Sequence, residues 1–189
     1  MAFTDFGGNS SQNTGPVPTP FYRHLDTNGD GTGIKNAIGD YSGAEEIFYV
    51  QPGAGEILRI ERLLILIRAP KATFYTDSYG SLGELSAGIS LRVQGDTGTL
   101  VGLTNGLPVK TNGNWGHYCF DTDIYPSSQG NNDTYLRVRW TFAKAGYPLR
   151  LVGDNNERLE AVMNDDMTDA GGNSLVEHYF HAQGYYEGT

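Results

Sequence analysis

The sequence predicts an all-β fold: an antiparallel β-sandwich of the jelly-roll type, preceded by an extended N-terminal arm. Segments such as YLRVRWTFA, residues 135–143, alternate apolar and polar side chains with a period of two, which is typical of half-buried antiparallel strands. Clusters of Gly, Asn, Asp and Ser separate these segments and predict turns. The 26 glycines leave little room for long helices, and no stretch shows the period of an amphipathic helix.

The expected strands follow one another from residue 45 onward. EEIFYVQ (residues 45–51) is followed by the turn PGAG and by EILRIERLLILIR (residues 56–68). The apolar positions of the second segment would also suit a buried helix, but its flanking Gly and Pro and its four isoleucines favour a long buried strand. Further expected strands are GISLRVQ (88–94), WGHYCFD (115–121), YLRVRWTFA (135–143), RLEAVMN (158–164) and LVEHYFHAQGYYE (175–187). We expect roughly eight to ten strands in all, which suits a sandwich or barrel.

We expect a single sandwich domain over residues 21–189 and a separate arm over residues 1–20. The arm is rich in Gly, Ser, Asn, Thr and Pro, and it offers few apolar side chains to offset the loss of chain entropy. Two interpretations are open: a floppy tail, or a segment that orders only against a neighbouring subunit. In the second case Phe3 and Phe6 would be the anchors.

Charge and cysteine content argue against several kinds of partner. The chain carries 13 basic and 22 acidic residues, a formal net charge of −9, and no basic run. Binding to nucleic acid or to an anionic membrane surface requires clustered Lys and Arg, so we expect neither. The longest apolar run, Leu63–Ile67, is far too short to span a bilayer. Cys119 is the only cysteine and the N-terminal segment does not resemble a signal peptide, so we expect folding in a reducing cytosol.

The stretch HLDTNGDGTG places Asp26, Asn28 and Asp30 at alternate positions, as at the start of a calcium-binding EF-hand loop. The twelfth position of such a loop requires a bidentate carboxylate, and here it is Ala37; the eighth position should be apolar and is Gly33. The EF-hand interpretation therefore fails. Two interpretations remain: a looser calcium site built from the same three residues, or a pair of turns in which Asp and Asn accept backbone hydrogen bonds.

No constellation of residues predicts an enzyme. The sequence has no G-x-S-x-G elbow, P-loop or dinucleotide fingerprint. In a strand His178 and His181 point to opposite faces, which makes them a poor metal pair, and His178 is expected in the core. His117 and Cys119 share a face but are not expected to make the contact that a Cys–His nucleophile needs. The acidic cluster NDDMTD, residues 164–169, is expected to be a solvated loop. We therefore expect neither catalytic nor cofactor-binding residues.

Three stretches of the sequence resemble known proteins. They are FYVQPGAGEILRIERLLILI (48–67), NGLPVKTNGNWGHYCFD (105–121) and RVRWTFAKAGYPLRLVGDNNERLEAVMNDD (137–166). With their flanking segments they make residues 21–188 similar to small virion structural proteins of tailed bacteriophages. The resemblance implies a jelly-roll-like, homo-oligomeric component of the virion that folds in the host cytoplasm. It further implies a capsid decoration or head-fibre role, with the major capsid protein as the main partner and no catalytic residues.

A second function is kept open beside the virion role. A host-surface or glycan-binding β-sandwich module of a tail or fibre would use exposed Tyr and Asp side chains, with or without calcium. Both functions are non-enzymatic. Glycan binding that is abolished by Tyr→Ala substitutions would favour the second function.

Overall fold

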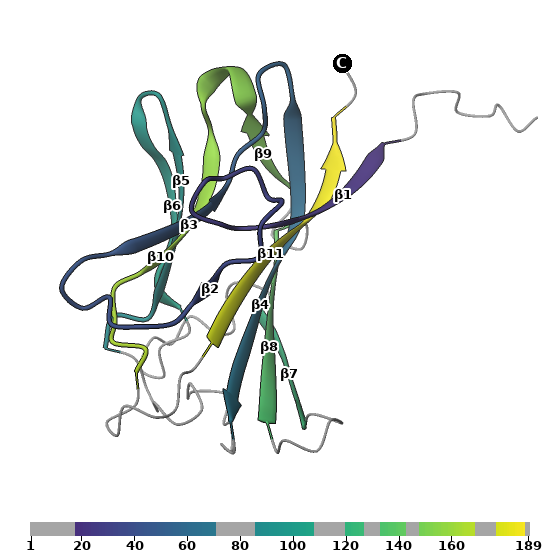
Figure 1. The fold of residues 1–189 in the computed structure, drawn as a ribbon. Helices are drawn as coiled ribbons and strands as arrows, with labels where there is room; N and C mark the ends of the chain where they lie inside the picture. The colour runs from purple at the N-terminus through teal and green to yellow at the C-terminus, as the bar shows by residue number, and fades with distance from the viewer. Residues whose placement is uncertain are drawn as a thin grey trace, which may run out of the picture.

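The computed structural model describes residues 18–70, 86–107, 120–126, 133–142, 148–168 and 177–187. In this part of the chain nearly all regular structure is β-strand, and one short 3-10 helix occurs (Figure 1). The elements are β1 (Thr19–His24), β2 (Asn36–Ala37), β3 (Glu46–Val50), β4 (Ile57–Pro70), β5 (Ile89–Gly95), β6 (Gly98–Leu107), β7 (Phe120–Pro126), β8 (Asp133–Thr141), β9 (Leu149–Val152), the 3-10 helix η4 (Gly153–Asn155), β10 (Arg158–Met163) and β11 (Glu177–Tyr186). Strand β1 thus begins inside the range expected for the arm.

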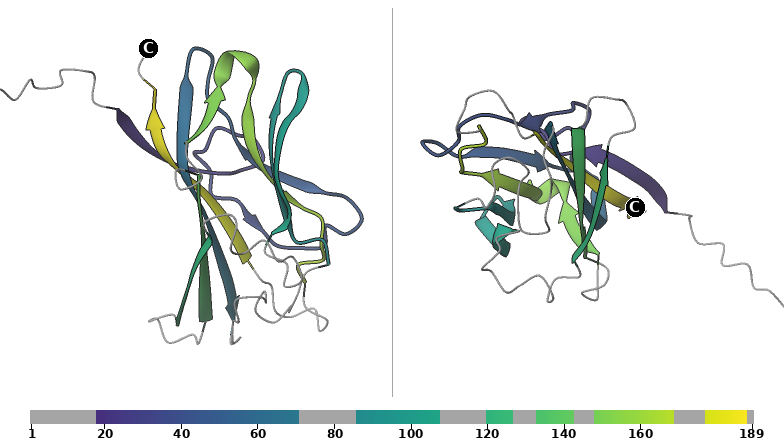
Figure 2. Two further views of the ribbon diagram at one scale, coloured as in Figure 1. Left: turned by 180° about the vertical axis from the view of Figure 1, so that it is seen from behind. Right: turned by 90° about the horizontal axis from the view of Figure 1, so that it is seen from below.

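The strands form two sheets that face each other (Figures 1 and 2). The first sheet has the order β1-β11-β4-β8-β7, with β2 also paired to β11 and β9 also paired to β4; the second has the order β3-β10-β5-β6. Every pairing between these strands is antiparallel. The predicted antiparallel β-sandwich is therefore confirmed. No helix within the described ranges is long and apolar enough to cross a membrane.

Strand β4 is the long buried strand that the sequence favoured over a helix. It pairs with β11 along one edge and with β8 and β9, one after the other, along its second edge. Leu58, Ile60, Leu63 and Ile65 point from β4 into the space between the sheets, and each has an exposed fraction of 0%. Three neighbouring strands, β11 on one side and β8 and β9 on the other, pair with the backbone of β4, which is why an apolar segment of this kind is stable as a strand.

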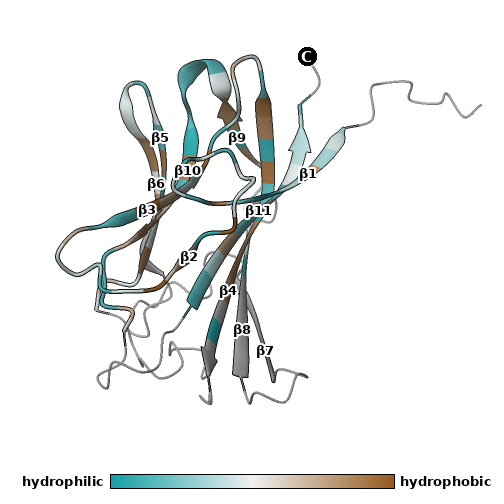
Figure 3. Cartoon of the chain, viewed as in Figure 1, coloured by the Kyte–Doolittle hydropathy of each residue, from teal (hydrophilic) through white to brown (hydrophobic). Residues whose placement is uncertain are grey.

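The hydrophobic core lies between the two sheets, where the apolar faces of the strands meet (Figure 3). Ile89, Leu91 and Val93 of β5 are buried on one face, as their alternation predicted. Phe48 from the second sheet and Phe180 from the first lie with their ring centroids 5.5 Å apart. His178, expected in the core, has an exposed fraction of 0%.

Strand β1 is an edge of the first sheet, and prolines close that edge. The backbone N–H of Leu25 donates to β11 at 2.9 Å. Because N–H groups along a strand point alternately to its two sides, the nitrogens of residues 24, 22, 20 and 18 point away from β11. Pro18 and Pro20 occupy two of these positions and have no N–H to offer. The N–H of His24 donates to a loop carbonyl at 3.4 Å, so only that of Tyr22 faces outward from this described edge. The edge therefore offers little for another strand to pair with.

Candidate functional site

Asp26 forms the base of the loop that follows β1. Its backbone exchanges two hydrogen bonds with Tyr49 of β3, at 3.1 and 2.8 Å, and the residue is 4% exposed. Its Oδ1 accepts a hydrogen bond from the N–H of Gly29 at 2.6 Å, and its Oδ2 accepts one from the N–H of Gly33 at 3.3 Å. The carboxylate of Asp26 therefore holds the loop closed from inside.

Asn28 and Asp30 lie on the exposed rim of the same loop. Oδ1 of Asp30 accepts hydrogen bonds from the N–H and the hydroxyl of Thr32, at 2.8 and 2.7 Å. The amide group of Asn28 donates to Oδ2 of Asp30 at 3.0 Å, and its oxygen accepts from the N–H of Asp30 at 3.3 Å. The hydrogen bonds from Thr32 lower the pKa of the Asp30 carboxyl. This is the hydrogen-bonding pattern of consecutive Asx turns.

The three candidate calcium ligands thus lie in one loop, but their oxygens are turned toward the loop's own donors. Within the described ranges there is no group of three or more His, Cys, Asp or Glu side chains that could hold a metal ion. Calcium binding by Asp26, Asn28 and Asp30 stays a prediction, and the turn interpretation accounts for the contacts that these side chains make.

Chelation gives a direct test of these two interpretations. Because the loop is closed by its own hydrogen bonds, we expect EGTA to leave the melting temperature unchanged. A ligand that binds only the folded state raises stability, so removal of a bound calcium ion would lower it. Differential scanning calorimetry with calcium and with EGTA measures the difference, and a clear fall in EGTA would favour the calcium site.

A polar pocket of about 510 Å³ opens between this loop and the turn that joins β3 to β4. Arg23 lies at its wall, donating a hydrogen bond to the hydroxyl of Tyr186 at 2.6 Å and facing the carboxylate of Glu56 at 3.6 Å. The pocket is lined by Arg23, Asn28, Gly29, Asp30, Tyr49, Gln51, Pro52, Gly53 and Glu56. It therefore presents both charges and several hydrogen-bonding groups to a ligand.

The ring of Tyr49 in this pocket is already packed. The guanidinium of Arg158 lies over it, 4.5 Å from the ring centroid. Gly29, with φ of +77°, approaches the ring so closely that a Cβ at this position would overlap it. Recognition in the pocket would therefore depend on the polar groups of Arg23, Asp30 and Glu56 rather than on stacking against Tyr49.

The acidic cluster at residues 164–169 differs from the solvated loop that the sequence predicted. Asp165 is only 4% exposed. Its carboxylate accepts hydrogen bonds from the backbone N–H groups of Ala87 at 3.1 Å and Gly88 at 2.8 Å, and from the hydroxyl of Ser86 at 3.0 Å. Asp166 is exposed, as expected. The prediction was wrong for Asp165 because its partners lie almost eighty residues away in the sequence.

The outer face of the first sheet, the side turned away from the second sheet, carries a cluster of aromatic and histidine rings. Tyr22 stacks on His181 with ring centroids 5.1 Å apart, and His24 meets His181 edge to face at 4.5 Å. Beside them is a hollow of about 290 Å³, mostly apolar in its exposed lining. It is lined by His24, Ile34, Leu66, Arg68, Tyr179 and His181. Tyr22 and Ile34 are 52% and 67% exposed, so apolar surface continues around the hollow.

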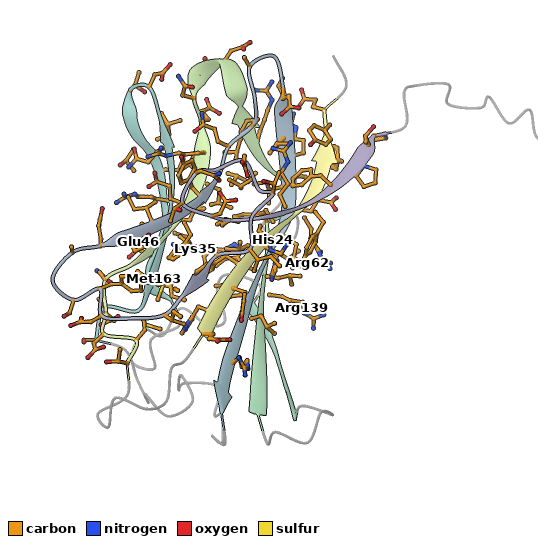
Figure 4. All side chains as sticks on the ribbon, viewed as in Figure 1. His24, Lys35, Glu46, Arg62, Arg139 and Met163 are labelled. Atoms are coloured by element: carbon orange, nitrogen blue, oxygen red, sulfur yellow. The ribbon has the colours of Figure 1, made fainter. Side chains whose placement is uncertain are left out.

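The basic residues of the first sheet are all arginine. Its strands contain seven Arg, no Lys and five carboxylates, which gives them a net charge of +2. Because the whole chain has a formal net charge of −9, the rest of the chain carries −11. Arg62 and Arg139 point away from the second sheet (Figure 4). Arg68 pairs with Glu177 at 2.7 Å, and Glu177 also accepts a hydrogen bond from Tyr179 at 2.6 Å. Burial, followed by the nearby Glu177, raises the pKa of Tyr179 to about 12.

His181 should make stability depend on pH. Burial and the neighbouring His24 lower its pKa to about 4, whereas an unfolded histidine titrates near pH 6.5. Between these values the unfolded state binds the extra proton, so stability falls as the pH falls from about 6.5 to about 4. With allowance for the partial exposure of His181, we expect a loss on the order of 1 kcal/mol. Urea unfolding of wild type and His181→Gln across this range measures it; equal slopes would contradict the assignment.

The outer face of the first sheet is the candidate site that sequence reasoning missed. The alternation in residues 135–143 does place Arg137 and Arg139 opposite the apolar side chains. It does not show that β8, β4, β11 and β1 lie side by side. Of the other predicted positions, Phe3, Phe6, His117 and Cys119 lie outside the described residues.

Comparison with known proteins adds no relative. No family model, curated protein or solved structure matches this chain.

Proposed function

We propose that this chain is a non-enzymatic structural protein of a bacteriophage virion that decorates or cements the capsid by multivalent docking. The observation that carries the proposal is the outer face of the first sheet, with its Tyr and His rings, half-buried leucines and arginines without lysine. Protein interfaces are enriched in Tyr and Arg and depleted in Lys, and their strongest contacts are often Tyr and Arg side chains. The sequence resemblance to phage virion proteins supplies the biological setting.

The strand order supports the jelly-roll part of this proposal. Strands from the first part of the chain pair with strands from its last part, β1 with β11 and β3 with β10. In the same way β4 pairs with β8 and β9. Along the chain, β1, β4, β9 and β11 of the first sheet thus alternate with β3, the pair β5 and β6, and β10 of the second sheet. A jelly roll is wound in this way, and viral capsid proteins use it widely. Because one fold serves many functions, the surface rather than the fold carries the proposal.

Charge gives a physical reason for repeated docking. The first sheet is weakly positive, and the remainder of the chain is strongly negative. Charge complementarity of this kind steers association and fixes orientation more than it adds affinity. Repeating a modest contact over a symmetric lattice would supply the affinity, because each further contact is made at high effective concentration.

The test uses phage that encode this chain. We expect the chain in purified virions by mass spectrometry, and we expect Leu64→Asp, on the outer face of β4, to remove it from them. Leu100→Asp is the matched control, because Leu100 is 43% exposed on β6 of the second sheet. Absence of the wild-type chain from virions would refute the structural role. Equal incorporation of both variants would show that this face is not the docking surface.

The polar pocket favours a second candidate function, recognition of a saccharide on a host surface. Its arginine, carboxylates and amides match the donors and acceptors that sugar hydroxyls require. Titration with a panel of sugars, followed by NMR, would detect binding, and Asp30→Asn should weaken it. Asp40→Asn is the control, because Asp40 accepts the same two hydrogen bonds from Ser42 that Asp30 accepts from Thr32, yet Asp40 does not line the pocket. Equal binding by both variants would exclude this pocket.

A further inference from the structure

We infer that the hollow on the outer face of the first sheet receives Phe6 from a neighbouring copy of this chain, so that exchanged N-terminal segments link the copies. The inference goes beyond the proposed function and requires only the homo-oligomeric state that the sequence resemblance implies, not the virion setting. It assigns a site and an occupant: the hollow beside His24 and His181, and residues 1–17 of the next copy.

The hollow has the size and chemistry for an aromatic ring. Its volume is about 290 Å³, and an apolar cavity of about 150 Å³ is already sufficient for benzene. Ile34 and Leu66 offer aliphatic contacts, and the rings of His24, Tyr179 and His181 offer edges and faces. The lowered pKa of His181 keeps this imidazole neutral at neutral pH, so no buried positive charge opposes an apolar guest.

Residues 1–17 supply a matching peptide. The sequence AFTDF places Phe3 and Phe6 on either side of Asp5, which is the only charged side chain in residues 1–17. The strands of the first sheet carry a net charge of +2, so a carboxylate beside the aromatic rings is complementary to this sheet. The rings and the charge of the segment therefore match this surface.

Distances favour a neighbouring copy over the same chain. Strand β1 ends at the hollow with His24, and Thr19, at the start of the strand, lies about 17 Å from His24. Pro16, Pro18 and Pro20 favour an extended chain, which carries the segment back to residue 15 about 12 Å farther away. Phe6 and Gly15 are nine positions apart in the sequence, and a segment of this length spans about 17 Å on average and about 30 Å at most. This segment would have to be almost fully extended to return about 29 Å to the hollow of its own copy, whereas docking in a neighbouring copy requires no such reversal.

The contact should be made by side chains rather than by an added strand. Pro18 and Pro20 leave the free edge of β1 almost without outward N–H groups. The arriving segment is therefore expected to lie across the outer face and not to extend the sheet.

Photo-crosslinking of the full chain tests the inference. A Phe6→p-benzoylphenylalanine variant is prepared once at natural isotope abundance and once labelled with nitrogen-15. The two forms are mixed, refolded together and irradiated. We expect adducts that join position 6 of one isotopic form to peptides of β4 or β11 of the other. Adducts within one copy only, or adducts confined to other strands, would overturn the inference.

Light scattering gives a second, independent measurement. We expect Phe3→Ala/Phe6→Ala and Leu66→Asp each to lower the solution mass toward that of a monomer, and Leu100→Asp to leave it unchanged. An unchanged mass for the first two variants would overturn the inference. Virion incorporation is measured separately. If the variants keep the wild-type solution mass and the wild-type chain is incorporated normally, only the arm exchange is refuted. If the arm exchange is observed but the chain is absent from virions, only the proposed function is refuted.

Discussion

Replacing Asp165 with alanine is expected to lower the free energy of unfolding by about 3 kcal/mol. The carboxylate is almost fully buried and accepts hydrogen bonds from the N–H groups of Ala87 and Gly88 and from the hydroxyl of Ser86. These bonds fix the start of β5 to the segment that follows β10. The substitution would leave buried donors without an acceptor, and an unsatisfied buried donor is more costly than a lost surface hydrogen bond.

Urea denaturation of Asp165→Ala and Asp166→Ala measures the effect. Asp166 is the adjacent residue, but it is exposed and its carboxylate bonds only locally to Thr168. We expect Asp166→Ala to cost less than about 1 kcal/mol, within the range of surface substitutions. Asp165→Asn keeps one acceptor oxygen and should lie between the two. Similar losses for both alanine variants would show that Asp165 does not fix the two segments to each other.

The second large effect is expected at Glu160. Glu160 has an exposed fraction of 0% and accepts hydrogen bonds from Nε of Arg92 at 2.5 Å and from Nε of Arg158 at 2.6 Å. Glu160→Ala would leave two arginines facing each other across β10 and β5 without the charge between them. Removing one partner of a fully buried pair costs about 3–5 kcal/mol. Because both guanidinium groups partly reach solvent, we expect a smaller loss of about 2–3 kcal/mol.

Glu45 provides the matched control for Glu160. It also pairs with Arg92, at 3.5 Å, but its side chain is 49% exposed. Exposed ion pairs contribute about 0–1 kcal/mol, so Glu45→Ala should have little effect in the same urea titration. Equal effects of the two substitutions would mean that burial of Glu160 does not determine the strength of this cluster.

The period-two pattern was sufficient to predict the kind of elements but not their partners. Ile89, Leu91 and Val93 share a buried face as expected, and β4 is a strand although its composition also suited a helix. Alternation reports which face of a strand is buried, and so it predicts a sandwich. It carries no information about which strands are neighbours, because the pairings of an antiparallel sandwich join residues far apart in the chain.

The same limit explains the candidate site. The turn interpretation accounts for Asn28 and Asp30, which accept hydrogen bonds from the backbone two residues on, because such Asx turns are local and can be predicted from spacing. Asp165 and Glu160 could not be identified, because Ser86, Ala87 and Gly88 lie almost eighty residues from Asp165 and Arg92 lies 68 residues from Glu160. The hollow is assembled from β1, β4 and β11 and from the loop at Ile34, so no single stretch of sequence contains its pattern.

The prolines at the edge of β1 have a consequence for how the chain behaves at high concentration. A sheet that can gain strands at a free edge can grow without limit into a fibre, and long-lived fibres remove protein from productive use. Here the backbone of β1 offers almost no donors to an incoming strand, so growth of the first sheet through this described edge is disfavoured. Where copies meet at this edge, side chains must make the contact, and the assembly is finite when its symmetry closes.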